Sequence, residues 1–435
     1  MAPALRFGFL TLLVLALAGA GLTSAAGAAT SCSRYAAPTG SDRAAGTPQD
    51  PFATAQKLVS SLTAGETGCL LPGTYHEDVT ISRGGSQGSP ITLTSAPGSR
   101  ATVRGRLWVT DNADDVVLQG LFIDARNASQ LPSPTVNGDR VRLLDNEITN
   151  FHDPAICLLL GSESGWGTAV DPVVQGNRIH DCGAGVSTNR HHGVYVQSTR
   201  NAQIVGNWIY DNTDRGIQLY PDAQNTVIAN NLIDGNGEGI MFSGEGGLAS
   251  SGSRIHGNVI SNATIRFNVE SWYPAGNPVG SDNLVQSNCV WNGKQGNVAP
   301  AVGFTVASAQ VVANPQFVDH DAKNFELAST SPCAGFGPTA VAQPAPVTSP
   351  PPPPSEPPVK GKPKKPAPKR TTQAATSKQP SFVRTNGVVR ILWQERYRTR
   401  PEFARYLDGR GLTYSAWSRK HPAAARVLRT NRLPG

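Results

Sequence analysis

The chain is poor in methionine, in aromatic residues and in long apolar stretches. Its 435 residues include two Met, and Phe, Trp and Tyr together make up 7%. Apart from one stretch at the N-terminus, no apolar run approaches the ~20 residues that a membrane-spanning helix needs, which excludes a polytopic membrane protein. No Cys-x-x-Cys motif occurs, which argues against a structural zinc site. Glycine (45) and proline (34) are abundant instead.

The formal net charge of +7 conceals two regions of opposite sign. Residues 31–337 contain 18 basic and 27 acidic side chains, whereas residues 338–380 contain 7 basic and 1 acidic. Residues 381–435 add 12 basic and 3 acidic side chains. The protein therefore has an acidic body and a basic tail, and the basic charge of the whole chain says little about what the body binds.

Residues 1–29 have the three parts of a secretory signal peptide. Arg6 supplies a positive start, Phe7–Leu17 an apolar region, and Ala26–Ala28 a small-residue cleavage pattern. A single membrane anchor is the alternative, but Gly and Ala interrupt the apolar run and no stop-transfer charge follows. We expect an exported protein, secreted or associated with the cell surface, with no transmembrane span in the mature chain.

The mature chain contains six cysteines, and an even number on an exported chain favours disulfide bonds. Fifteen pairings exist for six cysteines. The simplest prediction joins sequential neighbours, namely Cys32–Cys69, Cys157–Cys182 and Cys289–Cys333.

From about residue 100 a short unit recurs, with alternating apolar residues, a small residue, Asn, and then Ile or Val. Clear copies are Val173–Ile179, Ile204–Ile209, Val227–Ile233 and Ile255–Ile260. A second apolar strand that begins with Gly recurs every 23 residues, at Gly193, Gly216 and Gly239. Short strands at a period of 20–30 residues, without helical periodicity, predict an all-β fold, a parallel β-helix solenoid over residues 30–337.

Equivalent residues of successive coils stack about 4.8 Å apart in such a solenoid. The inward positions are therefore predicted to form aliphatic ladders, namely Val194–Ile217–Ile240 and Val196–Leu219–Phe242. Asn177, Asn207, Asn231 and Asn258 are predicted to form an inner asparagine ladder at a tight corner, where Asn tolerates the left-handed conformation.

These coils resemble the right-handed parallel β-helix of the pectate-lyase-like superfamily, with repeats of the carbohydrate-binding and sugar-hydrolase type. Three earlier segments carry the same resemblance, namely Pro51–Gln56, Leu71–Glu77 and Ile91–Gly98. In such proteins a capping helix leads into a Pro-Gly-Thr-Tyr turn and the first coils. The resemblance covers roughly residues 45–335. It implies a polysaccharide partner but leaves the activity open, because the superfamily includes lyases, hydrolases, epimerases and non-catalytic members.

The strands that follow the three repeated glycines are predicted to present the functional face. One outward ladder is expected to contain Tyr195, Gln218, Met241 and Asn268, and its neighbour Gln197, Tyr220, Ser243 and Glu270. Polar residues precede these strands, namely His191, His192, Asp214, Arg215 and Glu238. The segments 183–191 and 244–252 are expected to form walls beside this face.

A lyase or epimerase of uronate-containing glycans needs a cation to offset the carboxylate and a base near C5. Arg215 is the candidate cation, His191 or His192 the candidate base, and Tyr195 the candidate acid. The predicted substrate-binding residues are Gln197, Gln218, Tyr220, Glu238, Asn268 and Glu270.

Two other functions fit the same sequence. A glycoside hydrolase would need two carboxylates about 5–9.5 Å apart, for which the candidates are Asp214, Glu238, Glu245 and Glu270. A non-catalytic glycan-binding or cell-surface structural protein would present the same polar ladder to its ligand. No cofactor is indicated, although relatives use calcium, for which the candidate ligands are Asp211, Asp214 and Asp234.

The basic tail divides into two predicted parts. Residues 338–380 are a linker rich in Pro and Lys, with Ser349–Pro354 expected as polyproline II. Residues 381–435 place aromatic residues at helical spacing among arginines, which predicts a mini-domain of two or three short helices. On an exported protein we expect this domain to bind anionic cell-wall polymers rather than nucleic acid. We expect the protein to be a monomer.

Overall fold

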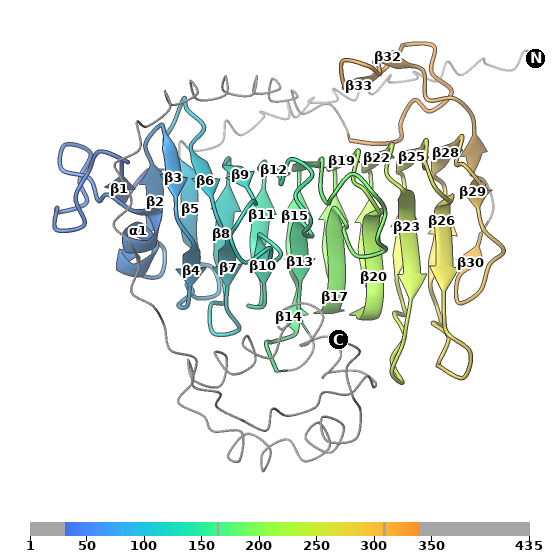
Figure 1. Cartoon of the computed structure of the whole chain (residues 1–435), viewed down its shortest axis with the longest axis horizontal. Coiled ribbons are helices and arrows are strands. Elements are labelled where there is room, and N and C mark those ends of the chain that lie inside the picture. The colour runs from blue at the N-terminus through green and yellow to red at the C-terminus, as the bar shows by residue number, and fades with distance from the viewer. Residues whose placement is uncertain (1–30, 163–164, 308–309, 339–435) are drawn as a thin grey trace, which may run out of the picture. The chain divides into compact units, whose positions relative to one another are not determined.

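The computed structural model describes residues 31–162, 165–307 and 310–338. The predicted signal peptide, the linker beyond residue 338 and the basic mini-domain therefore lie outside the described residues. Within them the chain winds through three long parallel sheets, visited in the order A, B, C in successive coils (Figure 1). This confirms the predicted all-β parallel solenoid.

The three sheets are built from very short strands. Sheet A contains β1 (Arg34–Ala36), β2 (Thr67–Leu70), β5 (Ile91–Ser95), β8 (Val116–Gln119), β11 (Arg142–Leu144), β15 (Val173–Gln175), β18 (Gln203–Val205), β21 (Val227–Ala229), β24 (Arg254–His256), β27 (Leu284–Gln286) and β30 (Thr305–Val306). Sheet B contains β3 (Thr74–His76), β6 (Thr102–Arg104), β9 (Phe122–Asp124), β12 (Glu147–Thr149), β16 (Arg178–His180), β19 (Trp208–Tyr210), β22 (Leu232–Asp234), β25 (Val259–Ser261), β28 (Cys289–Trp291) and β31 (Val311–Val312). Sheet C contains β4 (Val79–Ile81), β7 (Leu107–Val109), β10 (Thr135–Val136), β13 (Leu158–Leu160), β17 (Val194–Arg200), β20 (Arg215–Gln224), β23 (Glu238–Ser243), β26 (Phe267–Trp272) and β29 (Gly296–Val298), with β14 (Ala169–Val170) beside β17.

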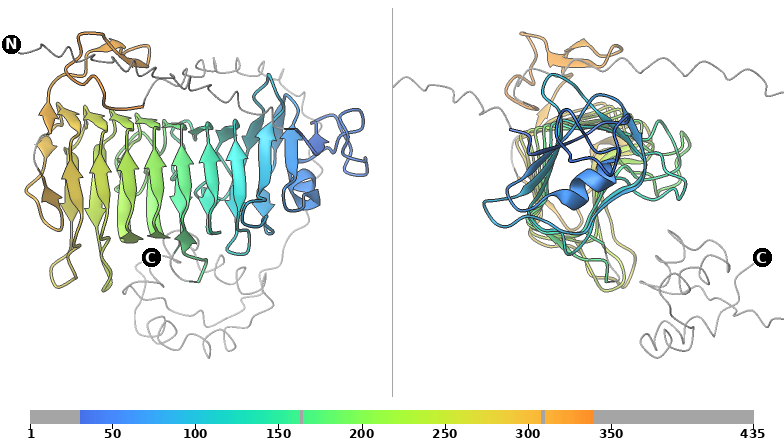
Figure 2. Two further views of the ribbon diagram at one scale, coloured as in Figure 1. Left: turned by 180° about the vertical axis from the view of Figure 1, so that it is seen from behind. Right: turned by 90° about the vertical axis from the view of Figure 1, so that its left-hand side faces the viewer.

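The sheets enclose a narrow apolar core. Viewed along the axis, the coils superimpose as a three-sided ring (Figure 2). Both predicted inward ladders are confirmed: Val194 pairs with Ile217 and Ile217 with Ile240, and the Val196, Leu219 and Phe242 set follows the same register. All six side chains are fully buried. Each such burial contributes about 1.5–3 kcal/mol, so the repeating apolar positions hold the coils together.

The predicted asparagine ladder is also confirmed, at the corner between sheets A and B. The amide oxygen of Asn207 accepts from the backbone N–H of Asn177 at 2.9 Å, and Asn231 and Asn258 continue the series one coil at a time. The left-handed conformation lies one residue earlier than expected, at Gly206 and Asn230. The ladder asparagines are thus held by stacked hydrogen bonds, while the preceding residue makes the turn.

The first coils are closed by helix α1 (Ala55–Ser61), in agreement with the expected capping helix. The hydroxyl of Thr54 caps its N-terminus by accepting from the backbone N–H of Lys57 at 3.0 Å. The buried side chains of Leu58 and Val59 pack into the apolar core. The helix therefore shields one end of the core from water.

Near the other end, β32 (Phe317–Asp319) and β33 (Asn324–Leu327) form an antiparallel hairpin. Phe325 of this hairpin packs in a second apolar cluster with Trp208 and Tyr210 of sheet B. His320 and Lys323 bind carboxylates of the same sheet. The hairpin thus covers part of the outer face of sheet B.

Three disulfide bonds join sequential cysteines, so the predicted pairing is confirmed. They are Cys32–Cys69, Cys157–Cys182 and Cys289–Cys333. The search of the described residues for a helix long and apolar enough to cross a membrane found none.

Candidate functional site

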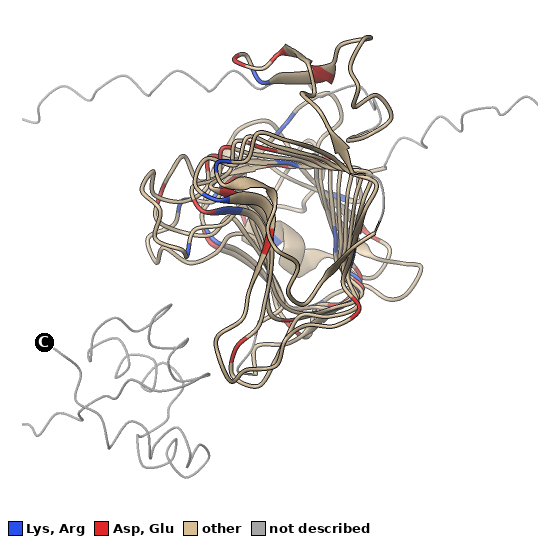
Figure 3. Ribbon diagram, turned by 90° about the vertical axis from the view of Figure 1, so that its right-hand side faces the viewer, with Lys and Arg blue, Asp and Glu red and all other residues tan. Residues whose placement is uncertain are grey.

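Many of the charged residues gather at one corner of the solenoid when it is viewed along its axis (Figure 3). The corner joins sheet B to sheet C, and the turns there supply most of the predicted site residues. The turn between β16 and β17 is long, whereas the turns before β20 and β23 are short. The long turn can therefore rise as a wall beside the strands of sheet C.

Asp214 fixes this wall. Its carboxylate accepts from the hydroxyl of Ser187 at 2.5 Å and from the backbone N–H groups of Arg190 and His191, each at 2.7 Å. Burial would raise the pKa of Asp214, but the hydrogen bonds from Ser187 and His191 lower it below the usual value. Asp214 is thus a positioning residue, and His191 is held as part of the wall.

Arg215 and Glu238 form a buried ion pair on neighbouring strands. The Nε of Arg215 donates to Oε2 of Glu238 at 2.8 Å, and its Nη2 donates to the side chain of Asn189 in the long turn at 2.8 Å. The two side chains are only 6% and 5% exposed. Arg215, the candidate cation, is therefore bonded to protein groups on both sides.

Glu270 and Arg266 extend this pair into a four-residue cluster, called the acid–base cluster below. Arg266 donates from Nε to both oxygens of Glu270 at 2.9 Å and from Nη2 at 2.5 Å. Its Nε also lies 3.7 Å from Glu238. Glu270 is 1% exposed, whereas the side chain of Arg266 is 43% exposed. Arg266 is thus the cation of the cluster that solvent can reach.

Glu238 has the proton affinity of a group that titrates near neutrality. Burial and the neighbouring carboxyl of Glu270 raise its pKa to about 7, against the attraction of Arg215 and Arg266. Two carboxyls in one buried site cannot both ionise easily, so one of them retains a proton. Glu238 can therefore keep a proton near neutral pH and donate it.

His192 has the opposite character. It is 2% exposed, and burial, followed by the charge of Arg215, lowers its pKa well below the usual value. Its Nδ1 makes no hydrogen bond, and neither does the buried Nε2 of Gln197 on β17. His192 is therefore a neutral imidazole at pH 7. Buried polar groups are normally hydrogen-bonded, so the unbonded nitrogens of His192 and Gln197 are exceptions that a ligand could satisfy.

Aromatic side chains continue the face beyond His192. The Tyr195 ring lies edge-on to His192, with centroids 5.5 Å apart, and is stacked near Tyr220 at 6.3 Å. The hydroxyl of Tyr220 donates to Glu245, which comes from the turn after β23. The predicted wall residues and the aromatic ladder thus meet on the same face, as does Gln218, which lies between Tyr195 and Met241 in the register.

The predicted register of the last strand is wrong by two residues. Met241 pairs with Glu270, so Glu270 and not Asn268 continues the ladder of Tyr195 and Gln218. The amide of Asn268 is fully buried and donates to the carbonyl of Trp291 at 2.8 Å. The longer connection before β26 shifts the repeat. Arg266, one residue before the position equivalent to Arg215 and Glu238, was therefore not predicted.

The three aspartates considered as calcium ligands do not converge. Asp211 binds Lys323 at 2.6 Å, Asp234 binds His320 at 2.7 Å, and Asp214 holds the long turn. Within the described part of the chain, no group of three or more His, Cys, Asp and Glu side chains is arranged to hold a metal ion. The aspartates therefore act as ion-pair and hydrogen-bond partners.

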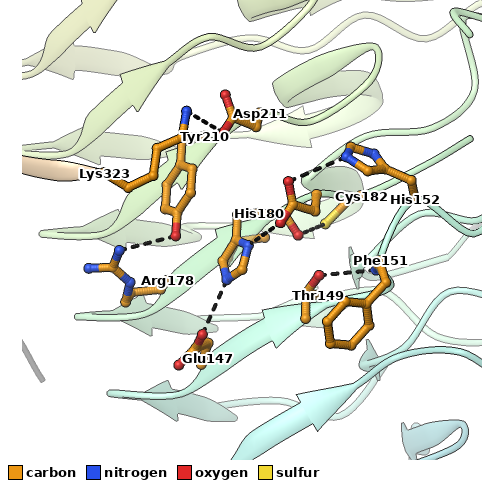
Figure 4. Close-up of polar contacts among 12 residues, drawn as sticks. Glu147, Thr149, Phe151, His152, Arg178, His180, Cys182, Tyr210, Asp211 and Lys323 are labelled. Carbon is orange, nitrogen blue, oxygen red and sulfur yellow. Dashed lines mark hydrogen bonds and ion pairs between the residues drawn. The ribbon is translucent and has the colours of Figure 1, made fainter. Parts of the chain in front are cut away.

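A second polar cluster lies on the outer face of sheet B (Figure 4). His180 bonds to Asp181 through Nδ1 at 2.8 Å and to Glu147 through Nε2 at 3.3 Å, and its ring stacks on Tyr210 with centroids 4.8 Å apart. Arg178 donates to the hydroxyl of Tyr210 at 3.1 Å. Both ring nitrogens of His180 are bonded, which indicates a structural network.

Comparison with known proteins supports the fold. Residues 135–313 match the family described as "Right handed beta helix region". The uncharacterized protein YwoF of Bacillus subtilis (strain 168) is 25% identical over 137 residues. This match covers 28% of the chain and 29% of that relative, so the chain spans less than a third of the relative it matches.

Several solved structures have similar folds at low identity. Pectate lyase Pel9A is 16% identical with a TM-score of 0.48, covering 72% of this chain and 93% of that one. The lacto-N-biosidase of Eubacterium ramulus is 12% identical with a TM-score of 0.46, covering 62% of each chain. The alginate lyase of Paenibacillus sp. str. FPU-7 is 15% identical with a TM-score of 0.38, covering 58% and 96%. At these values the likeness concerns the fold alone.

Proposed function

We propose that this right-handed parallel β-helix protein is a polysaccharide-active enzyme, a lyase or epimerase that acts on a uronate-containing glycan. The glycan would lie across the outer face of sheet C. The observation that carries the proposal is the acid–base cluster, in which Arg215 and Arg266 face the paired carboxyls of Glu238 and Glu270. Beside it stands His192, a neutral imidazole with an unbonded nitrogen.

The charge of the acid–base cluster suits an anionic sugar. When Glu238 is protonated, the cluster contains two guanidinium cations and one carboxylate, so it has a local positive excess within an acidic body. The exposed side chain of Arg266 is the group best placed to meet a uronate carboxylate. Such a contact would stabilise the negative charge that develops when the neighbouring carbon loses its proton.

His192 and Glu238 are in the protonation states that elimination requires near pH 7. In that reaction His192 takes the proton from C5, the C5 electron pair forms the C4–C5 double bond, and the glycosidic oxygen leaves C4 with a proton from Glu238. In epimerisation the proton returns to the opposite face of C5, and no bond of the chain breaks. Tyr195, which contacts His192, is the second candidate acid.

The guanidinium that the two carboxyls share favours this chemistry over hydrolysis. Glycoside hydrolases place their two carboxyl groups about 5–9.5 Å apart so that a sugar or a water molecule fits between them. Glu238 and Glu270 instead share one guanidinium, because Arg266 lies 3.7 Å from Glu238 and 2.5 Å from Glu270. Their arrangement favours storage of one proton rather than attack from two sides of a glycosidic bond.

Incubation of the protein with uronate polymers, followed by measurement of its products, tests the proposal. The full chain is incubated with polygalacturonate and with alginate, and we expect either ultraviolet absorbance from an unsaturated product or incorporation of solvent deuterium at C5. Glu238→Gln should abolish the signal, whereas Glu326→Gln, at an exposed position of the hairpin, should not. New reducing ends without absorbance or deuterium would show a hydrolase, and binding without turnover would show a binding protein. Either result contradicts the proposal.

We further propose that the protein works outside the cell and that its basic tail holds it to anionic wall polymers. Three disulfides favour an oxidising compartment. Mass spectrometry of the protein recovered from the culture medium should give a mature chain that begins near residue 30. Retention of the unprocessed chain in the cytoplasm would contradict export.

A further inference from the structure

A hollow of about 540 Å³ lies away from the acid–base cluster, where the first coils turn from sheet B into sheet C. Its volume is in the range of small-ligand sites. Its charged lining consists of Glu77, Asp78, Arg104, Arg126 and Asp153. These residues follow β3, β6, β9 and β12, so the hollow spans the turns of four successive coils.

Part of this lining is a rigid frame. Both oxygens of Glu77 accept from backbone N–H groups at the start of α1, at 2.8 and 3.0 Å. Asp78 accepts from the backbone N–H of Arg106 at 2.7 Å. Arg126 donates twice to Asp124, at 2.8 and 2.6 Å. These groups are held in place before any ligand arrives, which reduces the entropy cost of binding.

The rest of the lining keeps hydrogen-bonding capacity for a ligand. Within the described residues, the Asp153 carboxylate makes no hydrogen bond or ion pair shorter than 4 Å, so its oxygens can accept. Arg104 is held only loosely, with Nε 3.5 Å from Asp124, and its side chain is 43% exposed. The hollow thus offers an acceptor, Asp153, and a donor, Arg104, at the same corner and two coils apart.

An exposed aromatic ring stands next to these groups. Phe151 is 39% exposed and packs against the guanidinium of Arg126, 4.3 Å from its ring centre. Phe151 and His152 are both left-handed, with φ of 52° and 61°. Two successive non-glycine residues in this region are uncommon, and such strain often occurs at binding sites. The turn therefore places an aromatic side chain beside the polar hollow.

We propose that this hollow is a second saccharide-binding site that takes neutral, hydroxyl-rich sugar units. Two arginines face three carboxylates, and Asp124 lies behind the arginines, so the excess charge is negative and would repel a uronate. Hydroxyl groups, which both donate and accept, match the free acceptor of Asp153 and the free donors of Arg104. The opposite charge of the acid–base cluster selects uronates there.

Together the two sites define the class of glycan, an inference that depends on the proposed function. The turn that contains Arg126 and the strand that begins with Glu238 are four coils apart, or about 19 Å along the axis. A single chain that occupies both sites must present uronate residues at one and neutral residues at the other. The substrate class is therefore a mixed glycan and not a polyuronate.

The test measures binding by the full chain carrying Glu238→Gln, in which turnover is expected to be slow compared with binding. The probes are polygalacturonate, a rhamnogalacturonan backbone that alternates uronate with neutral sugar, and a neutral galactan. We expect the tightest binding to the alternating backbone. Arg104→Ala and Asp153→Ala should each weaken that binding at least fivefold while leaving the affinity for polygalacturonate within twofold. Arg142→Ala, at an exposed position on sheet A, is the matched control.

The outcomes separate this inference from the proposed function. If the parent and both hollow variants bound the alternating backbone equally, the second site would be overturned. An equal loss of affinity for all three probes would overturn it as well. Unchanged melting temperatures exclude misfolding as the cause of a loss. Turnover by the Glu238→Gln protein at the parent's rate would instead overturn the proposed acid–base chemistry and leave the binding result standing.

Discussion

Sheets B and C present the same kinds of side chains on their outer faces, yet the environments of these side chains differ. On sheet B, His180 lies between Glu147 and Asp181, and each ring nitrogen has a partner. On sheet C, His192 keeps one nitrogen unbonded. Histidines, tyrosines, carboxylates and arginines in one region are therefore not evidence of a reactive site.

The protonation states of the two histidines follow from their neighbours. Despite burial, which lowers the pKa of His180, its hydrogen bonds to the carboxylates of Asp181 and Glu147 raise that pKa above the usual value. Burial and the positive Arg215 lower the pKa of His192. The first histidine is therefore favoured as a cation that donates to two carboxylates, whereas the second is favoured as a neutral imidazole. The difference teaches that the charge of the nearest partner separates a structural histidine from a candidate catalytic one.

The largest expected effect on turnover comes from replacing Glu238 on sheet C, and Glu147, the buried glutamate beside His180 on sheet B, is its comparison. Glu238→Gln should lower turnover by about 10²–10⁴-fold, because it removes the proton donor. Glu147→Gln should leave turnover within about twofold and lower the free energy of unfolding by about 1–3 kcal/mol, because it breaks buried bonds to His180 and Arg100. Steady-state kinetics and urea unfolding distinguish the two effects. The reverse pattern would place the chemistry on sheet B.

Replacement of the two histidines should likewise affect turnover in one case and stability in the other, with a smaller loss of turnover than for Glu238. His192→Ala should lower turnover by about 10²-fold or more with little change in substrate affinity, because a base acts in the chemical step. His180→Ala should lower the melting temperature and leave turnover unchanged, because Glu147 and Asp181 lose their shared partner. If His192→Ala altered only stability, His192 would be a structural residue like His180.

The sequence predicted the solenoid, its inward ladders, the asparagine ladder and the disulfides, because these depend on repeats that one chain displays directly. It placed His192 and Glu238 at the start of strands of one sheet for the same reason. It missed Arg266 and shifted Asn268, because the longer connections of the last coils break the period of 23. It proposed Arg215 as a cation without showing its partners, since no pattern in a sequence reveals that Asn189 accepts a hydrogen bond from its guanidinium.

The pH dependence of turnover should reflect the two opposite pKa shifts. Activity should fall above pH 7, because Glu238, whose pKa is raised to about 7, loses the proton that it must donate. Activity should fall on the acidic side only below pH 6.5, because His192 has a lowered pKa and stays neutral until then. A pH profile of kcat measures both limbs, each with a slope of about tenfold per unit. In Glu238→Gln the residual activity should lose the alkaline limb, and an unchanged limb would assign it to another group.

The smallest effect should come from the histidine that attaches the C-terminal hairpin to sheet B. His320 bonds to Asp234 at 2.7 Å, and this hydrogen bond raises the pKa of His320. Its contribution to stability is therefore complete below the unfolded value of 6.5 and is lost as the pH rises through the folded pKa. His320→Ala should cost about 1 kcal/mol or less, because the imidazole is 42% exposed.

Asp234 is left with partners when this imidazole is removed, which is why the loss should be small. It still accepts from the hydroxyl of Ser261 at 2.6 Å and from the side chain of Asn262 at 2.7 Å. Urea unfolding at pH 5.5 and pH 8.5 should show the difference between parent and variant at the lower pH alone. A difference at both pH values would mean that His320 stabilises the hairpin by packing against Phe317 and Phe325 and not through its charge.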